Sequence, residues 1–387
     1  MSETIQARPG SAKGPRDYRL DFFRGLSLLF IFIDHVPDNK LRYVTLRAVA
    51  FSDAAEVFIF ISGFTAALVY GRAMAREGFV MGALRVYRRV WQLYVAHLCL
   101  FLIYSAEVAY TVLKFNNPLF ADELGVGNFL NEPAETILRV LTLQFQPTFL
   151  NILPLYIFLL ALFPLVLAAL RVHPLLAIVP SVLLYAASRA GGLEMPAYPP
   201  GDTWYFNPFA WQLLFVIGGA FGFAEGQGQS ILKVRQWMVW LAAGIVAFGV
   251  VVVASWTLHE MTGWFPTLLF SLWPVDKTEL PLLRLCNVLA LALLVGQLVP
   301  QQATFLTSRI GWIVVLCGQN SLEVFCLSIL LAVLAPTVQI LLGTSLLVQL
   351  LVNGVGIGAM VALGLLLSWF DAGGRLPVRP RTGAAGS

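Results

Sequence analysis

The sequence predicts an all-α, polytopic integral membrane protein with about ten transmembrane helices and both termini in the cytoplasm. The chain has 387 residues, of which 58% are hydrophobic and only 12% are charged. Soluble domains carry about 25% charged residues, so this chain has too little polar surface for a water-soluble protein of its size. Several of its apolar runs approach the roughly 20 residues that a helix needs to cross a bilayer.

The expected helices follow these apolar runs. They cover residues 20–37, 52–71, 90–112, 150–171, 174–190, 208–224, 237–257, 281–299, 313–335 and 347–369. The first helix is short and charged, so it must face protein or water rather than lipid. The third can begin earlier, as an interfacial basic helix through Arg85, Arg88 and Arg89.

The distribution of Lys and Arg predicts the orientation, because cytoplasmic loops carry an excess of both. With the N-terminus inside, most of these residues fall on the cytoplasmic side, although Lys40, Arg42 and Arg47 do not. We expect a disordered cytoplasmic tail over 1–19, one transmembrane domain over 20–370 and a second cytoplasmic tail over 371–387. The first apolar run is charged and lacks a small-residue cleavage site, so we interpret it as a retained helix.

The cysteines and the net charge give no sign of a metal site or a nucleic-acid partner. Cys99, Cys286, Cys317 and Cys326 lie in or beside apolar runs, and no pair has metal-ligand spacing. We interpret them as small buried hydrophobic residues and predict no metal. The formal net charge of +4 fits the basic cytoplasmic loops and requires no nucleic acid.

Ionisable residues within the predicted spans are the first candidates for a functional site, because a charge in a bilayer costs about 3 kcal/mol. The strongest cluster lies in the first span, with Arg24, Asp34 and His35. In a helix Arg24 and His35 are about 16 Å apart and project to one face. They are suited to bind the two ends of a long anionic ligand. A buried ion network without a catalytic role is the alternative.

The second predicted span supplies further candidates. Glu56 is a candidate to orient the His35 imidazole, as is Asp34, and Asp53 lies one turn nearer the outside. Ser62 and the glycine that follows it allow close approach of helices, and they also leave room for a thin substrate chain.

Basic and aromatic residues mark the two membrane boundaries. Arg85, Arg88 and Arg89 suit phosphate binding, because guanidinium groups bind phosphate bidentately. Anchoring to anionic lipid explains the same cluster. The predicted outer loops interleave polar residues with aromatic ones such as Trp204. This pattern suits stacking on sugars, and it also suits an interfacial aromatic belt.

The combination of motifs resembles a known family. Arg24 and His35 with ten residues between them, a Phe-Ile-Ser-Gly-Phe run and the Arg-rich third span resemble the acyltransferase type three superfamily. More narrowly, four stretches resemble the OpgC proteins, over most of residues 17–370. The stretches are Arg19-Leu20-Asp21-Phe22-Phe23-Arg24-Gly25, Phe51-Ser52-Asp53-Ala54-Ala55-Glu56-Val57-Phe58, Asn207-Pro208-Phe209-Ala210-Trp211-Gln212 and Asn320-Ser321-Leu322-Glu323-Val324-Phe325.

The resemblance implies a succinyltransferase of periplasmic glucans in the bacterial inner membrane. It implies that an acyl-CoA, with succinyl-CoA expected, binds the cytoplasmic Arg cluster and threads between helices towards His35. His35 would act as the general base on a sugar hydroxyl, with Asp34 or Glu56 orienting it. We assign the remaining roles as follows: Arg24, Ser62, Arg85, Arg88 and Arg89 bind the acyl-CoA, and Asp53, Trp204, Trp211 and Glu323 bind the acceptor.

Other interpretations stay open at this stage. Acetyl-CoA is an alternative donor, and another envelope glycan is an alternative acceptor. A glycan or solute transporter is a further alternative. It would show paired half-repeats and broken helices in matching positions, and neither pattern is evident in the sequence. A scaffold would leave Arg24 and His35 unexplained. Glu323 is alternatively an ion-pair partner for Arg284 or His97. The lipid bilayer is an expected partner, and the sequence is compatible with a homo-oligomer.

Overall fold

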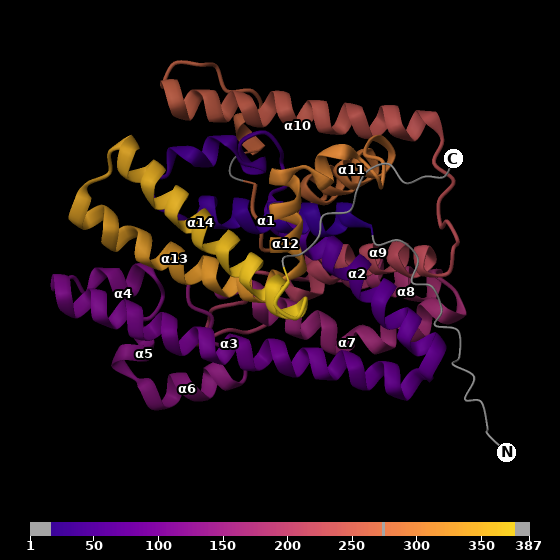
Figure 1. Ribbon diagram of the computed structural model, residues 1–387, viewed down its shortest axis with the longest axis horizontal. Helices are drawn as coiled ribbons and strands as arrows, with labels where there is room; N and C mark the ends of the chain where they lie inside the picture. The colour runs from indigo at the N-terminus through magenta and orange to yellow at the C-terminus, as the bar shows by residue number, and fades with distance from the viewer. Residues whose placement is uncertain (1–16, 273–274, 376–387) are drawn as a thin grey trace.

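The computed structural model describes residues 17–272 and 275–375, and these are organised almost entirely as helices (Figure 1). Extended segments pair there only at an isolated bridge between Pro196 and Thr203. The all-α prediction is confirmed. The predicted tails over 1–19 and 371–387 lie mostly outside the described residues.

The longer helices are α1 (Tyr18–His35), α2 (Ala54–Glu77), α3 (Phe79–Phe115), α7 (Ile152–Val172), α8 (Leu175–Gly191), α9 (Pro208–Gly226), α10 (Gln236–Thr262), α11 (Leu282–Leu298), α13 (Ser321–Leu342) and α14 (Leu346–Asp371). The shorter elements are η1 (Lys40–Val44), η2 (Leu46–Ala48), α4 (Leu119–Glu123), α5 (Gly127–Asn131), α6 (Pro133–Leu141), η3 (Phe270–Leu272), η4 (Thr304–Thr307) and α12 (Arg309–Gln319).

Apolar helices of spanning length indicate a membrane protein. Within the described residues, seven helices are long and apolar enough to cross a bilayer: α2, α3, α7, α9, α10, α13 and α14. Helices α8, α11 and α12 are apolar but shorter. Helix α1 has 18 residues and carries several charges, as the sequence predicts. The count of ten spans and the cytoplasmic placement of both termini remain predictions.

The predicted helix over 313–335 is wrong, because two helices meet within it. Helix α12 ends at Gln319 and α13 begins at Ser321. The Asn320 side chain donates to the Leu316 carbonyl oxygen at 2.9 Å and to the Ser368 hydroxyl at 2.9 Å. This side chain satisfies a carbonyl at the end of α12 and ties the break to α14, so the helix does not continue.

Helix α3 begins well before the predicted residue 90, at Phe79, so the expected basic extension of the third helix is confirmed. Gly78 separates α2 from α3 with a φ of 88°. This backbone conformation costs a glycine little, and it reverses the chain between the two helices. The turn places the arginines of α3 beside the second half of α2.

Helix α1 packs inside the bundle against α2, α12 and α13, whereas α10 lies along one edge (Figure 1). Small residues permit this packing. A Cβ at Gly25 would meet the backbone of Val314 on α12, and one at Gly63 on α2 would meet the backbone of Phe215 on α9. Gly63 therefore allows the close helix approach that the sequence indicates. Helix α1 is therefore surrounded by other helices along its length.

Candidate active site

A cavity of about 180 Å³ lies beside the middle of α1. It brings together three residues that the sequence assigns to donor binding: Arg24 on α1, Ser62 on α2 and Arg89 on α3. Helices α7 and α13 complete its wall. Along α2 the cavity extends from Phe58 to Tyr70, so it is elongated in the direction of the helices. The wall is largely apolar with a guanidinium at two positions, which suits a long ligand that carries anionic groups.

Arg24 is held across the α1–α2 interface. Its Nη2 atom donates to the Thr65 hydroxyl and, at 3.4 Å, to the Ile61 carbonyl oxygen. The Thr65 hydroxyl in turn donates to the same carbonyl at 2.8 Å, which fixes the threonine on its helix. Ser62 is buried one turn away. Thr65 was not among the predicted residues; its position three residues after Ser62 on one helix face is the signal that identifies it.

His35 is the last residue of α1 and lies at one end of the bundle, where α2 begins. We call this the His35 end. The imidazole packs on the Phe149 ring with 4.3 Å between ring centroids. Its Nδ1 atom is buried and makes no hydrogen bond within the described residues. Phe149 lies three residues before Ile152, which lines the cavity. The ring on which the imidazole packs thus belongs to the segment that leads into the cavity wall.

Asp34 and His35 are adjacent in sequence but have different surroundings. The Asp34 Oδ1 atom accepts a hydrogen bond from the Thr45 hydroxyl at 2.8 Å. This contact ties the end of α1 to the loop that follows it. Within the part of the chain that the structure describes, no hydrogen bond joins Asp34 to the imidazole, in agreement with the rule that adjacent helical residues do not face each other.

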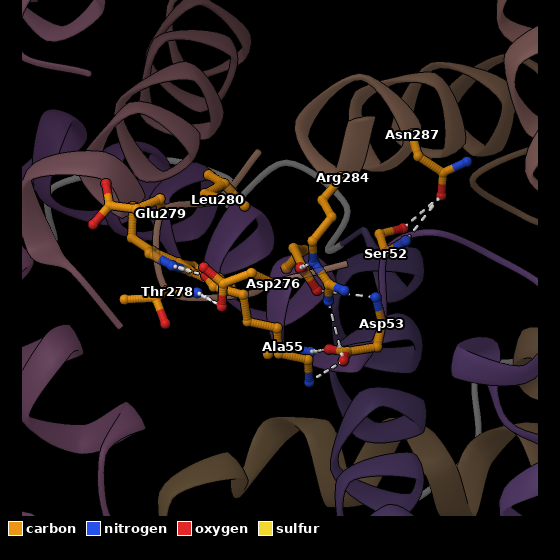
Figure 2. A network of polar contacts seen from close by, with 12 residues as sticks. Ser52, Asp53, Ala55, Asp276, Thr278, Glu279, Leu280, Arg284 and Asn287 are labelled. Atoms are coloured by element: carbon orange, nitrogen blue, oxygen red, sulfur yellow. Dashed lines mark hydrogen bonds and ion pairs between the residues drawn. The ribbon is translucent and has the colours of Figure 1, made fainter. Parts of the chain in front are cut away.

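A buried charge network lies at the His35 end (Figure 2). Arg284 on α11 donates from Nε to Glu56 Oε1 at 2.5 Å and from Nη2 to Asp53 Oδ2 at 3.2 Å. Lys277 also pairs with Asp53 Oδ2. Burial opposes a charge on Lys277, but the Asp53 and Glu56 carboxylates outweigh it and raise the pKa of the ammonium above its ordinary value.

Asp53 and Glu56 also begin α2. Asp53 Oδ1 accepts from the Ala55 N–H at 2.9 Å, and Glu56 Oε2 accepts from the Asp53 N–H at 2.9 Å. This reciprocal arrangement is a capping box, which stabilises a helix N-terminus. Both Glu56 oxygens are thereby engaged, by Arg284 and by the backbone. The structure thus places Glu56 in the helix cap and ion network, and none of its hydrogen bonds reaches His35.

Residues 16–372 match the family model described as OpgC protein. The chain belongs to the OpgC family. The match covers nearly the whole chain and indicates a glucan-modifying acyltransferase. No curated protein and no solved structure matches the chain.

The arginines of this OpgC-family chain divide into two groups. Arg89 lines the cavity, whereas Arg85 and Arg88 do not. Arg85 pairs with Glu77 at 2.7 Å, and its side chain is 56% exposed. Arg88 is exposed on the same helix. Helix geometry explains the separation. Arg85 lies one turn before Arg89 on the same face of α3, where it reaches Glu77, and Arg88 projects to a different, exposed side of the helix.

The two tryptophans assigned to the acceptor are buried. Trp211 is 0% exposed, and its Nε1 donates to the Lys277 carbonyl oxygen at 3.0 Å. Trp204 is 4% exposed and packs edge-on against Phe158. Neither ring offers a face on which a sugar could stack. In this OpgC-family chain the Asn207–Gln212 motif instead anchors the segment that carries Lys277.

Glu323 lies in the first turn of α13 and is exposed. Its neighbours Ser321 and Leu322 line the cavity, so Glu323 adjoins the Arg24 region rather than the His35 end. The alternative pairing of Glu323 with Arg284 is wrong, because Arg284 binds Asp53 and Glu56.

Lys277 was missed as a site residue because the sequence places it in an outer loop far from His35 along the chain. A lone lysine between Asp276 and Thr278 carries no motif. The signal that could have identified it is charge balance, since Asp53 and Glu56 in one buried turn require two cations.

Proposed function

We propose that the chain is a transmembrane O-acyltransferase that moves a succinyl group from cytoplasmic succinyl-CoA to hydroxyls of periplasmic glucans. The supporting observation is that Arg24, Ser62 and Arg89 line one cavity. His35 packs on Phe149, which lies three residues before Ile152 in the wall of the same cavity. Three helices supply these residues, so the grouping belongs to the fold and not to one sequence motif. Membership of the OpgC family supports acyl transfer to a glucan.

In the proposed mechanism, the donor enters at the Arg89 side of the cavity. The Arg89 guanidinium binds phosphate of the coenzyme, and Arg24 binds a polar part of the arm that lies deeper. The small side chain of Ser62 leaves space for that arm. Arg85 and Arg88, on the exposed part of α3, attract the polyanionic donor to the membrane surface rather than contact it in the cavity.

His35 acts as the general base in this proposal. It accepts the proton of a glucan hydroxyl while the hydroxyl oxygen attacks the thioester carbonyl carbon. A carbon–oxygen bond forms, the carbon–sulfur bond breaks, and the coenzyme leaves as its thiol with the proton returned by His35. The Phe149 ring limits rotation of the imidazole. Asp34 and Glu56 act indirectly, because they fix the end of α1 and the beginning of α2.

Mass spectrometry of periplasmic glucans tests the proposal. Cells with the wild-type protein, without it, and with His35→Ala are compared. His97→Ala is the matched control. Like His35 Nδ1, the two ring nitrogens of His97 are buried and make no hydrogen bond among the described residues, but His97 lies on α3. We expect succinyl groups on glucans only with the wild-type and His97→Ala proteins, each at normal membrane levels.

Other outcomes identify which part of the proposal fails. Loss of acetyl rather than succinyl groups would replace the donor, and an acyl change on a different envelope glycan would replace the acceptor. Full succinylation with His35→Ala would overturn the mechanism. If no acyl group depends on the protein, acyl transfer itself is refuted and transport becomes the leading explanation.

A further inference from the structure

The segment before α11 holds Lys277 at a fixed place at the His35 end. The Trp211 indole N–H donates to the Lys277 carbonyl oxygen at 3.0 Å. Three residues later, the Tyr185 hydroxyl donates to the Leu280 carbonyl oxygen at 2.8 Å. Figure 2 shows this segment running alongside the charge network. Helices α8 and α9 thus anchor the backbone at the lysine and three residues after it, so its ammonium is positioned by the fold.

Lys277 differs from the other charges in the network by its accessibility. Its side chain is 28% exposed, whereas those of Asp53, Arg284 and Glu56 are 7%, 7% and 0% exposed. An ammonium group has three N–H donors, and the ion pair with Asp53 uses one of them. The two remaining donors are therefore able to bind a further anion. The two carboxylates, Lys277 and Arg284 sum to zero charge, so such an anion meets no excess negative charge.

The position of Lys277 relative to the cavity is set by α2. The cavity extends along this helix from Tyr70 to Phe58, and Asp53 lies just over one turn beyond Phe58. Because Lys277 pairs with Asp53, its ammonium lies past the outer end of the cavity. His35 lies at the same end of the bundle, because α1 ends at His35 where the neighbouring α2 begins just after Asp53.

We propose that Lys277 binds the distal carboxylate of the acyl group and thereby selects a dicarboxylic acyl donor over a neutral one. The inference rests on the proposed function, because it requires a donor that enters past Arg89. An acyl group is the leading end of such a donor. When its thioester carbon reaches His35, a carboxylate at the far end of the chain extends beyond His35, towards Lys277. A neutral acetyl group is too short and has no charge to make this contact.

The test compares two donors with one purified protein in lipid nanodiscs. Release of coenzyme A thiol is measured with succinyl-CoA and with acetyl-CoA, in the presence of isolated periplasmic glucans. The readout is the ratio of the two kcat/KM values. A loss of folded protein lowers both values equally, so this ratio reports selectivity even if a variant is less stable.

We expect Lys277→Gln to lower kcat/KM for succinyl-CoA by about 10- to 100-fold, the effect of losing a hydrogen bond to a charged group. The value for acetyl-CoA should change less than about threefold, because that donor makes no such bond. Lys277→Arg keeps the charge and should retain the preference. The matched control is Arg47→Gln, since Arg47 is an exposed cation on η2, in the connection between α1 and α2.

Each contrary result has a distinct meaning. An equal loss with both donors in Lys277→Gln would overturn the inference and leave acyl transfer intact, with Lys277 acting only on structure or on the reaction common to both donors. A change of ratio in Arg47→Gln but not in Lys277→Gln would also overturn it. A wild-type protein without activity on either donor would refute both the inference and the proposed function.

Discussion

Replacing Arg284 with Met tests whether the charge network stabilises the fold. Arg284 binds Glu56 at 2.5 Å and Asp53 at 3.2 Å, and the Glu56 side chain is 0% exposed. Without the guanidinium, Glu56 keeps one hydrogen bond from a backbone N–H and has no ion-pair partner left among residues 17–272 and 275–375. Removal of one partner from a buried ion pair costs about 3–5 kcal/mol. We therefore expect Arg284→Met to lower the free energy of unfolding by about that amount.

The assay is thermal or denaturant unfolding of the purified protein in detergent, followed by tryptophan fluorescence. The second variant combines Arg284→Met with Glu56→Gln, which removes both charges of the closer pair. Neutral replacement of a buried pair is much less costly than loss of one partner, so the double variant should be more stable than Arg284→Met alone. Arg47→Gln is the surface control and should lose less than about 0.5 kcal/mol. The reasoning is refuted if Arg284→Met is as stable as this control, or if the double variant shows no recovery.

Three further predictions concern packing, donor binding and topology. Gly63→Ala should cost about 1–3 kcal/mol, because the added methyl meets the Phe215 backbone, whereas Gly244→Ala in open space on α10 should cost nothing; equal unfolding midpoints would contradict this. Arg89→Gln should raise the donor KM about tenfold and Arg88→Gln much less, since only Arg89 lines the cavity; steady-state kinetics with equal effects would argue against the assignment. Green fluorescent protein fused to either end should fluoresce, and active alkaline phosphatase at an end would contradict its cytoplasmic placement.

Hydrophobic pattern was sufficient to predict most helices, because each one follows an apolar run that is visible locally. The predictions for α9 and α14 begin within one residue of the observed helices. The failure at Asn320 has a tertiary cause. The contact from its side chain to Ser368 on α14 involves a residue far along the chain, and the apolar run around it shows no interruption strong enough to predict a break.

The sequence alone determined that this is a helical membrane protein with ionisable groups in its first span, since burying a charge is costly enough to make such residues conspicuous. It also identified Arg24, Ser62 and Arg89 one by one, each on its own helix. Only the tertiary structure decided which residues meet. Of the three arginines on α3, only Arg89 lines the cavity. Glu56 forms an ion pair with Arg284, and Lys277 forms one with Asp53 near the end of α1. These pairings depend on how helices that are distant in sequence pack together, and the local pattern of residues does not predict that packing.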